Sequence, residues 1–463
     1  MIDEIDFPAF NTDAGNYENK FLDVMQFLYM KSKYCVQVYI SLALLIIVGM
    51  SGCSKTDFSF LNLMPAPDVY SDEIIDPFLD PTLEKTSEYI FYATDRKPDP
   101  GQEHFYSNER GFGLVLGSAK PVFELGDQTW QEVLRTSFMK NRTDEHPVRI
   151  AEITEFGVLD RTITVFTPPD QIDQNHGATA IDFAQTVNAK LESSKNKDIY
   201  IYVHGFKTDF RNPLLVGNEL WHFLGYDGVF IAFAWPSNQE TLAYLADTEE
   251  TAISARNLRI LTEFLSEETN AENIHLIGYS AGSRVVLTAL AHTAFIHSKI
   301  DREYVPKKPR IGRVILVASE IDRQLVGAYL AEGLMNIPTS LTVYLSGNDK
   351  ALDMSKRVFR RERLGQVLSE ELAPNVIRYL NDTPELQLID VSKTEGATEG
   401  NGHDYFRTSP IVSSDILVSL MYDLEPHERG LVKSANVPIW TFPEDYKERL
   451  RSLLKERPVS INR

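Results

Sequence analysis

The feature that most limits the fold of this chain is a regular alternation of apolar strands and amphipathic helices between about residues 178 and 392. Short runs of β-branched and aromatic residues predict strands at 198–205, 228–235, 273–279, 313–319, 341–347 and 386–392. Apolar residues at helical spacing predict helices at 178–191, 213–224, 248–265 and 283–297, with a basic helix at 354–364. Near-continuous apolar strands need cover on both sides. The pattern therefore predicts the α/β class, with a mostly parallel central sheet and helices on both faces.

Further strands are predicted before this alternation, at 88–96, 111–117 and 149–157. The run 161–167 is predicted as a hairpin partner of 149–157 or as another edge strand. We expect these strands to extend one edge of the sheet, partly antiparallel. The whole α/β domain is assigned to 88–425. Residues 426–463 are expected to be a C-terminal cap or tail, with a charged helix at 444–456 lying in solvent.

Composition excludes several classes of function. The chain has 463 residues, with 46 Lys+Arg against 66 Asp+Glu, which gives a net charge of −20. A surface this acidic repels phosphate backbones, so we expect no nucleic-acid partner. Its two cysteines, Cys35 and Cys53, are too few for a disulfide scaffold, a Cys-rich zinc site or an iron–sulfur cluster. The sequence contains no H-E-x-x-H, P-loop or dinucleotide fingerprint at a strand end, and we expect neither metal nor cofactor.

An uncharged run at 34–54 dominates the N-terminal region. It is about long enough to cross the ~30 Å hydrocarbon core of a bilayer. Two interpretations remain open, a retained single-pass anchor and a secretory signal. The segment Met50-Ser51-Gly52-Cys53 resembles a bacterial lipobox, in which Cys53 is lipidated and becomes the new N-terminus, although Met50 stands where Leu is usual.

Residues 1–29 are acidic, whereas the start of a signal should be basic. Translation from Met30 would place Lys31 and Lys33 directly before the apolar run. We therefore interpret 1–29 as a gene-model extension or a disordered tail and 30–53 as the signal or membrane segment. Residues 54–87 are interpreted as a proline-bearing linker without a packed element. This organisation predicts a protein anchored at the bacterial cell envelope, with its folded domain in the periplasm.

The segment Gly278-Tyr279-Ser280-Ala281-Gly282 joins the predicted strand 273–279 to the predicted helix 283–297. It matches the G-x-S-x-G nucleophile elbow in the strand–turn–helix context that gives this common pattern its meaning. The elbow holds its serine on a tight, strained turn, and its glycines let neighbouring backbone approach. The motif predicts Ser280 as a nucleophile.

A serine nucleophile needs a base and an acid, which follow it along the chain in the order acid, then histidine. Past a credible acid only His403 and His427 remain, and His403 lies in a glycine-flanked loop after the last predicted strand. His427 lies in an acidic, peripheral stretch. We therefore predict His403 as the base.

The acid should lie at the end of the next-to-last strand, where Asp349 follows 341–347. Its carboxylate would accept the Nδ1–H of the histidine and fix its tautomer. Glu320 and Asp322, one strand earlier, are rivals for this role. We favour Asp349.

Stabilising a developing oxyanion requires two backbone N–H groups. One should come from Ala281, directly after the nucleophile. The other is expected in the loop His204-Gly205-Phe206 after strand 198–205, where the N–H of Phe206 is the candidate donor. The side chain of His204 is expected to be a core residue without a chemical role.

Together these motifs resemble a bacterial α/β-hydrolase family that is still catalogued as a domain of unknown function. The resemblance is carried by Tyr244, Asp247 and the segments HGF (204–206), FAWPS (233–237), GYSAG (278–282), NDKA (348–351), GHDYF (402–406) and YATDR (92–96). It extends over roughly 88–422, and the segment 118–148 departs from it and is expected to be an insertion. The resemblance implies an α/β-hydrolase fold and a lipase- or esterase-like serine hydrolase, and it does not specify the substrate.

The most concrete hypothesis is a membrane-tethered serine hydrolase that cleaves a small-molecule or lipid ester through an acyl-enzyme on Ser280. Two alternatives remain open, an acyltransferase on the same fold and a non-catalytic envelope binding protein. The sequence does not indicate an oligomeric state.

Overall fold

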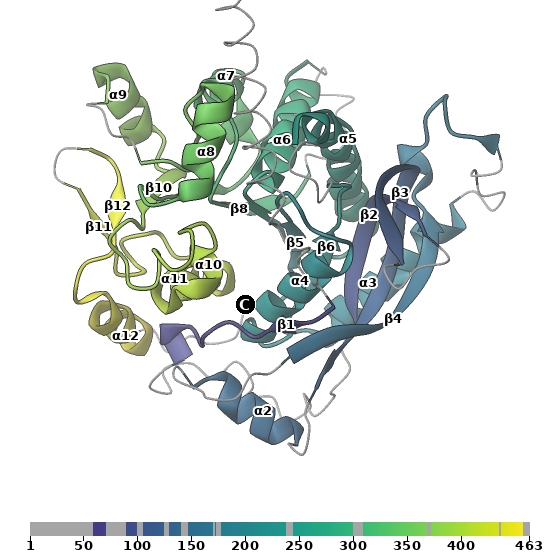
Figure 1. Ribbon diagram of the computed structural model, residues 1–463, viewed down its shortest axis with the longest axis horizontal. Helices are drawn as coiled ribbons and strands as arrows, with labels where there is room; N and C mark the ends of the chain where they lie inside the picture. The colour runs from purple at the N-terminus through teal and green to yellow at the C-terminus, as the bar shows by residue number, and fades with distance from the viewer. Residues whose placement is uncertain are drawn as a thin grey trace, which may run out of the picture. The chain divides into compact units, whose positions relative to one another are not determined.

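Figure 1 shows the computed structural model of the chain. The structure describes residues 59–70, 89–99, 105–124, 129–139, 147–169, 172, 177–237, 244–299, 309–367, 372–434 and 437–456. Two compact units divide the chain, Met1–Thr56 and Asp57–Arg463, and every described residue belongs to the second. The predicted tail 1–29, the predicted signal or membrane segment 30–53 and Cys53 lie outside the described residues. Within these described ranges, none of the helices combines the length and the apolar character needed to span a bilayer.

The described strands form one twelve-stranded sheet in the order β1-β4-β3-β2-β6-β5-β7-β8-β9-β10-β12-β11. Its middle is parallel and comprises β2 (Ile90–Pro98), β6 (Val229–Phe233), β5 (Ile199–Val203), β7 (Ile274–Tyr279), β8 (Ile311–Val317), β9 (Ser340–Leu345), β10 (Leu386–Asp390) and β12 (Trp440–Thr441). Antiparallel pairing adds β3 (Tyr106–Phe123), β4 (Pro147–Val158) and β1 (Leu61–Asn62) at one edge and β11 (Val432–Lys433) at the other. The mostly parallel sheet with an antiparallel edge confirms the predicted class.

Helices cover both faces of this sheet (Figure 1). One face carries α3 (Ala178–Ser193), α5 (Tyr244–Glu268) and α6 (Gly282–Lys299), and the other carries α4 (Arg211–Phe223), α10 (Tyr405–Thr408), α11 (Pro410–Met421) and α12 (Tyr446–Glu456). The remaining described helices are α2 (Trp130–Ser137), α7 (Arg323–Ala331), α8 (Lys350–Phe359) and α9 (Pro374–Asp382), with 3₁₀ turns at Asp68–Tyr70, Asp160–Thr162 and Leu334–Asn336.

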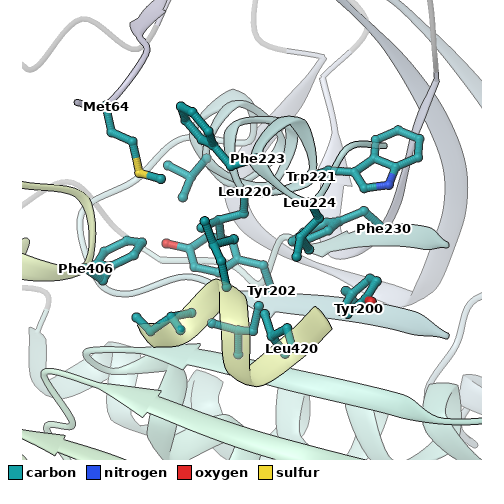
Figure 2. Packing of buried hydrophobic residues seen from close by; sticks show 14 of the residues in the cluster. Met64, Tyr200, Tyr202, Leu220, Trp221, Phe223, Leu224, Phe230, Phe406 and Leu420 are labelled. Carbon is teal, nitrogen blue, oxygen red and sulfur yellow. The ribbon is translucent and has the colours of Figure 1, made fainter. Parts of the chain in front are cut away.

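Two hydrophobic cores follow from the alternation of side chains along the strands. On β5, Ile201 and Val203 belong to the core beneath α3, α5 and α6, whereas Tyr200 and Tyr202 belong to the opposite core. Figure 2 shows this second core, in which α4 contributes Leu220 and α11 contributes Leu420. A slip of one residue would exchange the β5 side chains between these two cores, just before the carboxyl end of the strand where the candidate site lies.

Residues 59–70 pack into the domain, which corrects the prediction of an unstructured linker for this part of 54–87. Leu61 pairs with Val148 of β4, and Met64 and Tyr70 are buried. The prolines of this segment exclude regular structure over most of its length, but side chains far along the chain satisfy its backbone. The N–H of Val69, for example, donates to Ser414 Oγ at 2.9 Å. We call residues 59–70 the strap.

The described residues of the C-terminal region, 426–434 and 437–456, are also part of the domain rather than a cap or tail. Ile389 of β10 pairs with Trp440, so β12 extends the parallel sheet. Helix α12 buries Tyr446, Leu450 and Leu454, which corrects the expectation of a helix lying in solvent at 444–456. Most of its charged residues lie on the outer face, because the inner face carries apolar residues at helical spacing.

The strand predicted at 161–167 is wrong. Thr162 lies in a 3₁₀ turn, where its hydroxyl accepts from the N–H of Leu114 at 2.8 Å and donates to the carbonyl of Leu159 at 2.6 Å. Local bonds of this kind compete with ladder formation. Val165 and Phe166, two of the residues that suggested a strand, are 94% and 85% exposed.

Candidate active site

Ser280 lies on a sharp turn between β7 and α6, as the motif predicts. Its φ is +52°, in the left-handed region that L-residues rarely adopt. Gly282 makes the turn feasible, because a Cβ at this position would lie 2.2 Å from the carbonyl oxygen of Val203. The turn therefore holds the Ser280 side chain in one direction at the carboxyl edge of the sheet.

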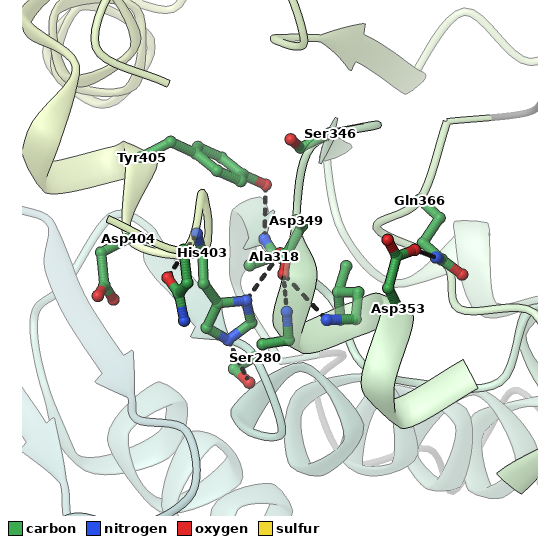
Figure 3. A network of polar contacts seen from close by, with 12 residues as sticks. Ser280, Ala318, Ser346, Asp349, Asp353, Gln366, His403, Asp404 and Tyr405 are labelled. Atoms are coloured by element: carbon green, nitrogen blue, oxygen red, sulfur yellow. Dashed lines mark hydrogen bonds and ion pairs between the residues drawn. The ribbon is translucent and has the colours of Figure 1, made fainter. Parts of the chain in front are cut away.

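Three predicted side chains meet at this turn (Figure 3). His403 Nε2 lies 2.9 Å from Ser280 Oγ, and His403 Nδ1 lies 2.7 Å from Asp349 Oδ2. This geometry suits a tautomer in which Nδ1–H donates to the carboxylate and Nε2 accepts from the serine hydroxyl.

The Asp349 carboxylate is held in place by hydrogen bonds to its other oxygen, Oδ1. Asp349 is the N-cap of α8, and its Oδ1 accepts from the N–H groups of Ala351 at 3.0 Å and Leu352 at 2.9 Å. These capping bonds leave Oδ2 directed at the imidazole. The side chain is 0% exposed, so the charge that faces the ring is shielded from water.

The pKa of His403 is raised above its ordinary value by its surroundings. Burial of the ring opposes the charged form, but the hydrogen bond and negative charge of Asp349 outweigh it, with further contributions from Asp404 and Glu320. The imidazolium form is therefore favoured relative to an exposed histidine, as a ring that must take a proton requires.

The histidine loop, residues 399–404, is anchored on both sides of His403. Before it, Asn401 accepts from the N–H of His403 through Oδ1 at 3.1 Å and from the N–H of Lys350 through its carbonyl at 3.0 Å. After it, Asp404 accepts a hydrogen bond from the hydroxyl of Tyr279, the residue before Ser280. The neighbours of the two reacting residues are thus bonded to each other.

Tyr405, which follows the loop, adds an anchor that sequence reasoning missed. Its hydroxyl accepts from the N–H of Ala318 at 2.7 Å (Figure 3) and donates to the carbonyl of Tyr344 at 3.1 Å. One buried side chain therefore joins the ends of β8 and β9. The motif GHDYF already contains Asp404 and Tyr405, but nothing in it names their partners.

The rival residues have other contacts. Glu320 is buried and accepts from Arg284 Nη2 at 3.2 Å and from Ser355 Oγ at 3.0 Å. Asp322 caps α7, and His427 stacks on Trp440 with ring centroids 6.4 Å apart. The carboxylate hydrogen-bonded to His403 belongs to Asp349 and not to either rival.

The loop after β5 lies directly against the serine. A Cβ at Gly205 would come within 2.8 Å of the Ser280 Cβ, so only glycine permits this approach. The next residue, Phe206, places its ring 5.7 Å from that of Trp235. The N–H of Ala281 has no hydrogen-bond partner among the described residues. Of the two candidate oxyanion-hole donors, Ala281 therefore follows Ser280 directly in sequence, and Phe206 belongs to the loop that contacts Ser280 in space.

His204 supports this loop as a core residue, as predicted. Its Nε2 lies 3.0 Å from the carbonyl oxygen of Trp235, and its Nδ1 lies 2.7 Å from both the carbonyl oxygen of Gly205 and the Thr208 hydroxyl. The indole N–H of Trp235 donates to the carbonyl of His204 at 2.7 Å. Burial, together with the charge of Arg96, lowers the pKa of His204 to about 3, so the ring is neutral. The segments HGF and FAWPS are therefore tied to each other.

The YATDR segment of β2 ties this loop to the rest of the fold. Thr94 donates to the carbonyl of Ala234 at 2.6 Å, and Arg96 donates to the carbonyl of Thr208 at 3.0 Å. Asp95 accepts from Ser254 of α5 at 2.8 Å, and burial raises its pKa to about 6. Thr94 and Arg96 thus support the FAWPS and HGF segments, and Asp95 ties β2 to α5.

Among the described residues, no group of three or more His, Cys, Asp or Glu side chains is placed to hold a metal ion. Residues 179–420 match the family described as alpha/beta hydrolase of unknown function (DUF900). The chain belongs to this family. In this α/β hydrolase the residues that match the family extend from α3 to α11. The match does not include YATDR, the strap or the segment 118–148.

A solved structure, a lipase-esterase related protein from Clostridium acetobutylicum ATCC 824, is 16% identical to the chain. The alignment covers 56% of this chain and 83% of that chain, with a TM-score of 0.20. No curated protein matches the sequence.

Proposed function

We propose that this α/β hydrolase is a serine hydrolase that cleaves an ester or related acyl bond through an acyl-enzyme on Ser280. The observation that carries the proposal is the continuous hydrogen-bonded series Ser280–His403–Asp349 at a strained strand–helix turn. A serine held only for structure would not need a buried base oriented by a buried carboxylate.

In the proposed mechanism, Ser280 Oγ attacks the substrate carbonyl carbon while its proton passes to His403 Nε2. Asp349 stabilises the imidazolium that forms and does not itself take the proton. His403 then donates the proton to the departing alkoxide, and an ester of Ser280 remains. Water, deprotonated by His403, attacks this ester, which releases the carboxylic acid and restores the serine.

The developing oxyanion would be stabilised by the N–H groups of Ala281 and Phe206. Support for the first is its position directly after the nucleophile and its lack of a partner among the described residues. Support for the second is the contact of its loop, at Gly205, with Ser280. Loss of one donor of this kind typically costs about 10²–10³ in turnover.

A fluorophosphonate probe tests the nucleophile. The full chain should be labelled covalently at Ser280, and Ser280→Ala should abolish both labelling and ester turnover. Ser298→Ala, at an exposed serine of α6, the helix that follows Ser280, is the matched control and should label like the parent. Equal labelling of Ser280→Ala and the parent would show that the nucleophile is misassigned.

The acyl acceptor requires a separate measurement. Esters of graded acyl length, offered with and without an added alcohol, distinguish free acid from transferred acyl product. Free acid as the main product with alcohol present supports a hydrolase, and ester exchange supports the acyltransferase alternative. A chain that neither labels nor turns over any ester supports a binding role.

We further propose that the chain is tethered to the bacterial cell envelope, with lipid on Cys53 and a lipid-like ester as substrate. The support is the uncharged run 34–54, the basic pair Lys31 and Lys33, and the small residues before Cys53. Stable anchoring needs more than one acyl chain or a spanning helix. Mass spectrometry of membrane-extracted protein tests this. A lipidated N-terminal Cys53 is expected, and an unmodified Cys53 with residues 34–52 still attached would leave the single-pass anchor.

A further inference from the structure

The strap reaches α10, the helix that follows the histidine loop, through one partly buried ion pair. Arg407 lies on α10, four residues after His403, and its guanidinium binds Glu219 of α4 at both oxygens, at 2.6 and 3.0 Å. The same guanidinium donates to the carbonyl of Asn62 at 3.1 Å, and the N–H of Met64 donates to Glu219 Oε1. Two residues of the strap therefore complete the pair between α4 and α10.

This arrangement makes the position of Arg407 depend on the strap. The Glu219 side chain is 1% exposed, so its charge must be balanced by partners within the protein. Arg407 balances it with a rigid planar fork, which fixes the direction of approach as well as the distance. The strap contributes one donor to the carboxylate and one acceptor to the guanidinium, and without them each ion would have an unsatisfied position.

Helix α10 transmits this position to His403. It is only four residues long and follows the histidine loop directly, so it has little stability of its own. Phe406 packs on Tyr279, with ring centroids 5.0 Å apart, and Tyr279 lies 5.2 Å from the His403 ring. A shift of α10 would therefore move the ring that must stay within hydrogen-bond distance of Ser280.

We propose that the strap is a positioning element of the active site. The strap hydrogen-bonds to both Glu219 and Arg407 and so holds α10 in place. Through α10 it keeps the His403 ring within hydrogen-bond distance of Ser280. Arg407, Glu219 and the Met64 N–H are positioning groups and do not touch substrate. The inference rests on the proposed serine hydrolase function.

The test uses the full chain and variants at both ends of the contact. Arg407→Lys keeps the charge and loses the fork, and Met64→Pro removes the N–H that donates to Glu219. Val69→Ala is the control within the strap, because it removes buried apolar contacts away from Glu219. Arg313→Lys is the control for a buried cation, since Arg313 lies near the amino end of β8, away from the site.

Turnover is normalised to active sites counted by fluorophosphonate titration. Arg407→Lys and Met64→Pro should each lower kcat by roughly 10- to 100-fold, with KM nearly unchanged, because a misplaced base slows the chemical step rather than binding. The two reductions in kcat should not multiply when Arg407→Lys and Met64→Pro are combined, since both act through one ion pair. Both controls should keep the parent kcat per active site, even if they unfold at lower temperature.

A kcat per active site that stays at the parent value in both Arg407→Lys and Met64→Pro would overturn the proposal and leave the strap a purely structural role. Histidine-selective NMR separates this result from failure of the hydrolase proposal. The Nδ1–H signal of His403, bonded to Asp349, should shift or broaden in Arg407→Lys and stay unchanged in Val69→Ala. If the parent proves inactive, that shift still supports positioning, and an unchanged signal overturns it.

Discussion

Asp349 uses its two carboxylate oxygens for different purposes. Oδ1 caps α8, and Oδ2 accepts from His403. The order of residues along the chain was enough to select Asp349 and His403 as candidates. It could not reveal that Asp404 bonds to Tyr279, because those residues are 125 positions apart and neither has a distinctive local pattern.

Replacing Asp349 with asparagine should separate these two purposes. The asparagine oxygen can still cap α8, so the fold should persist, but its amide cannot accept the Nδ1–H and supports the wrong tautomer. Turnover should fall by about 10⁴. Asp322→Asn is the matched control, since Asp322 caps α7 in the same manner, with Oδ1 accepting from Gln324 at 2.7 Å. A larger loss for Asp322→Asn than for Asp349→Asn would move the acid to the earlier strand.

The charge of Asp404 should contribute, after that of Asp349, to where activity falls at low pH. His403 acts as a base only when neutral, and its pKa is raised, so the acid limb of kcat/KM should lie above about 6.5. Asp404→Asn removes one negative charge near the ring, which lowers the His403 pKa and should move that limb to lower pH. Tyr279→Phe keeps the charge and loses the hydrogen bond, so its limb should stay near that of the parent. A limb that moves to higher pH in Asp404→Asn contradicts this account.

At the scale of elements, a strand or helix could be predicted when its burial produced a recognisable hydrophobic pattern in the sequence. The parallel strands β5 to β10 were predicted because each is a near-continuous apolar run, buried along nearly all of its length. Helix α11 was missed because it is buried almost all round and therefore shows no amphipathic period. The two-residue strands β11 and β12 are too short to produce any pattern.

Helix α11 carries one half of a fully buried ion pair, whose contribution to stability can be tested. Asp415, on α11, accepts from Arg429 Nε at 2.7 Å and from the Tyr344 hydroxyl at 2.6 Å, and the side chains of both ions are 0% exposed. Arg429→Met should lower the free energy of unfolding by about 3–5 kcal/mol, because it leaves a buried carboxylate uncompensated.

Urea unfolding of a paired variant tests the cause. Arg429→Met combined with Asp415→Asn removes both charges and keeps an acceptor for Tyr344, so it should be more stable than Arg429→Met alone. If the double variant is the less stable of the two, charge imbalance is not the reason for the loss.

At the scale of the whole molecule, the domain begins earlier than its first long strand. The strap was interpreted as a tether because Pro65 and Pro67 interrupt any period, and because its partners are distant in sequence. Met64 bonds to Glu219, 155 positions away, and Val69 bonds to Ser414, 345 positions away. Single-sequence patterns report on neighbours along the chain and cannot indicate such contacts.

Truncation should show that the strap is part of the folded unit. A fragment of residues 57–463 should retain the thermal midpoint of the domain, whereas residues 71–463 should melt far lower or fail to fold. Each fully buried apolar side chain contributes about 1.5–3 kcal/mol, and the strap buries Leu63, Met64, Val69 and Tyr70. That sum is comparable to the whole stability of an ordinary domain, about 5–15 kcal/mol. Equal midpoints for the two fragments would refute this prediction.

The distant partners of the strap also set an order of events during synthesis. The strap leaves the ribosome before α4, α10, α11 and α12 exist, and Asp68 meets Lys447, at 2.8 Å, only near the end of the chain. Contacts this far apart in sequence form late, because long loops must close before such contacts can form. The first segment of the domain to be made is thus among the last to dock. In a partly synthesised chain the strap has not yet docked and cannot hold the histidine loop in place. Under the positioning proposal, the hydrolase therefore stays inactive until its C-terminal helices have been made.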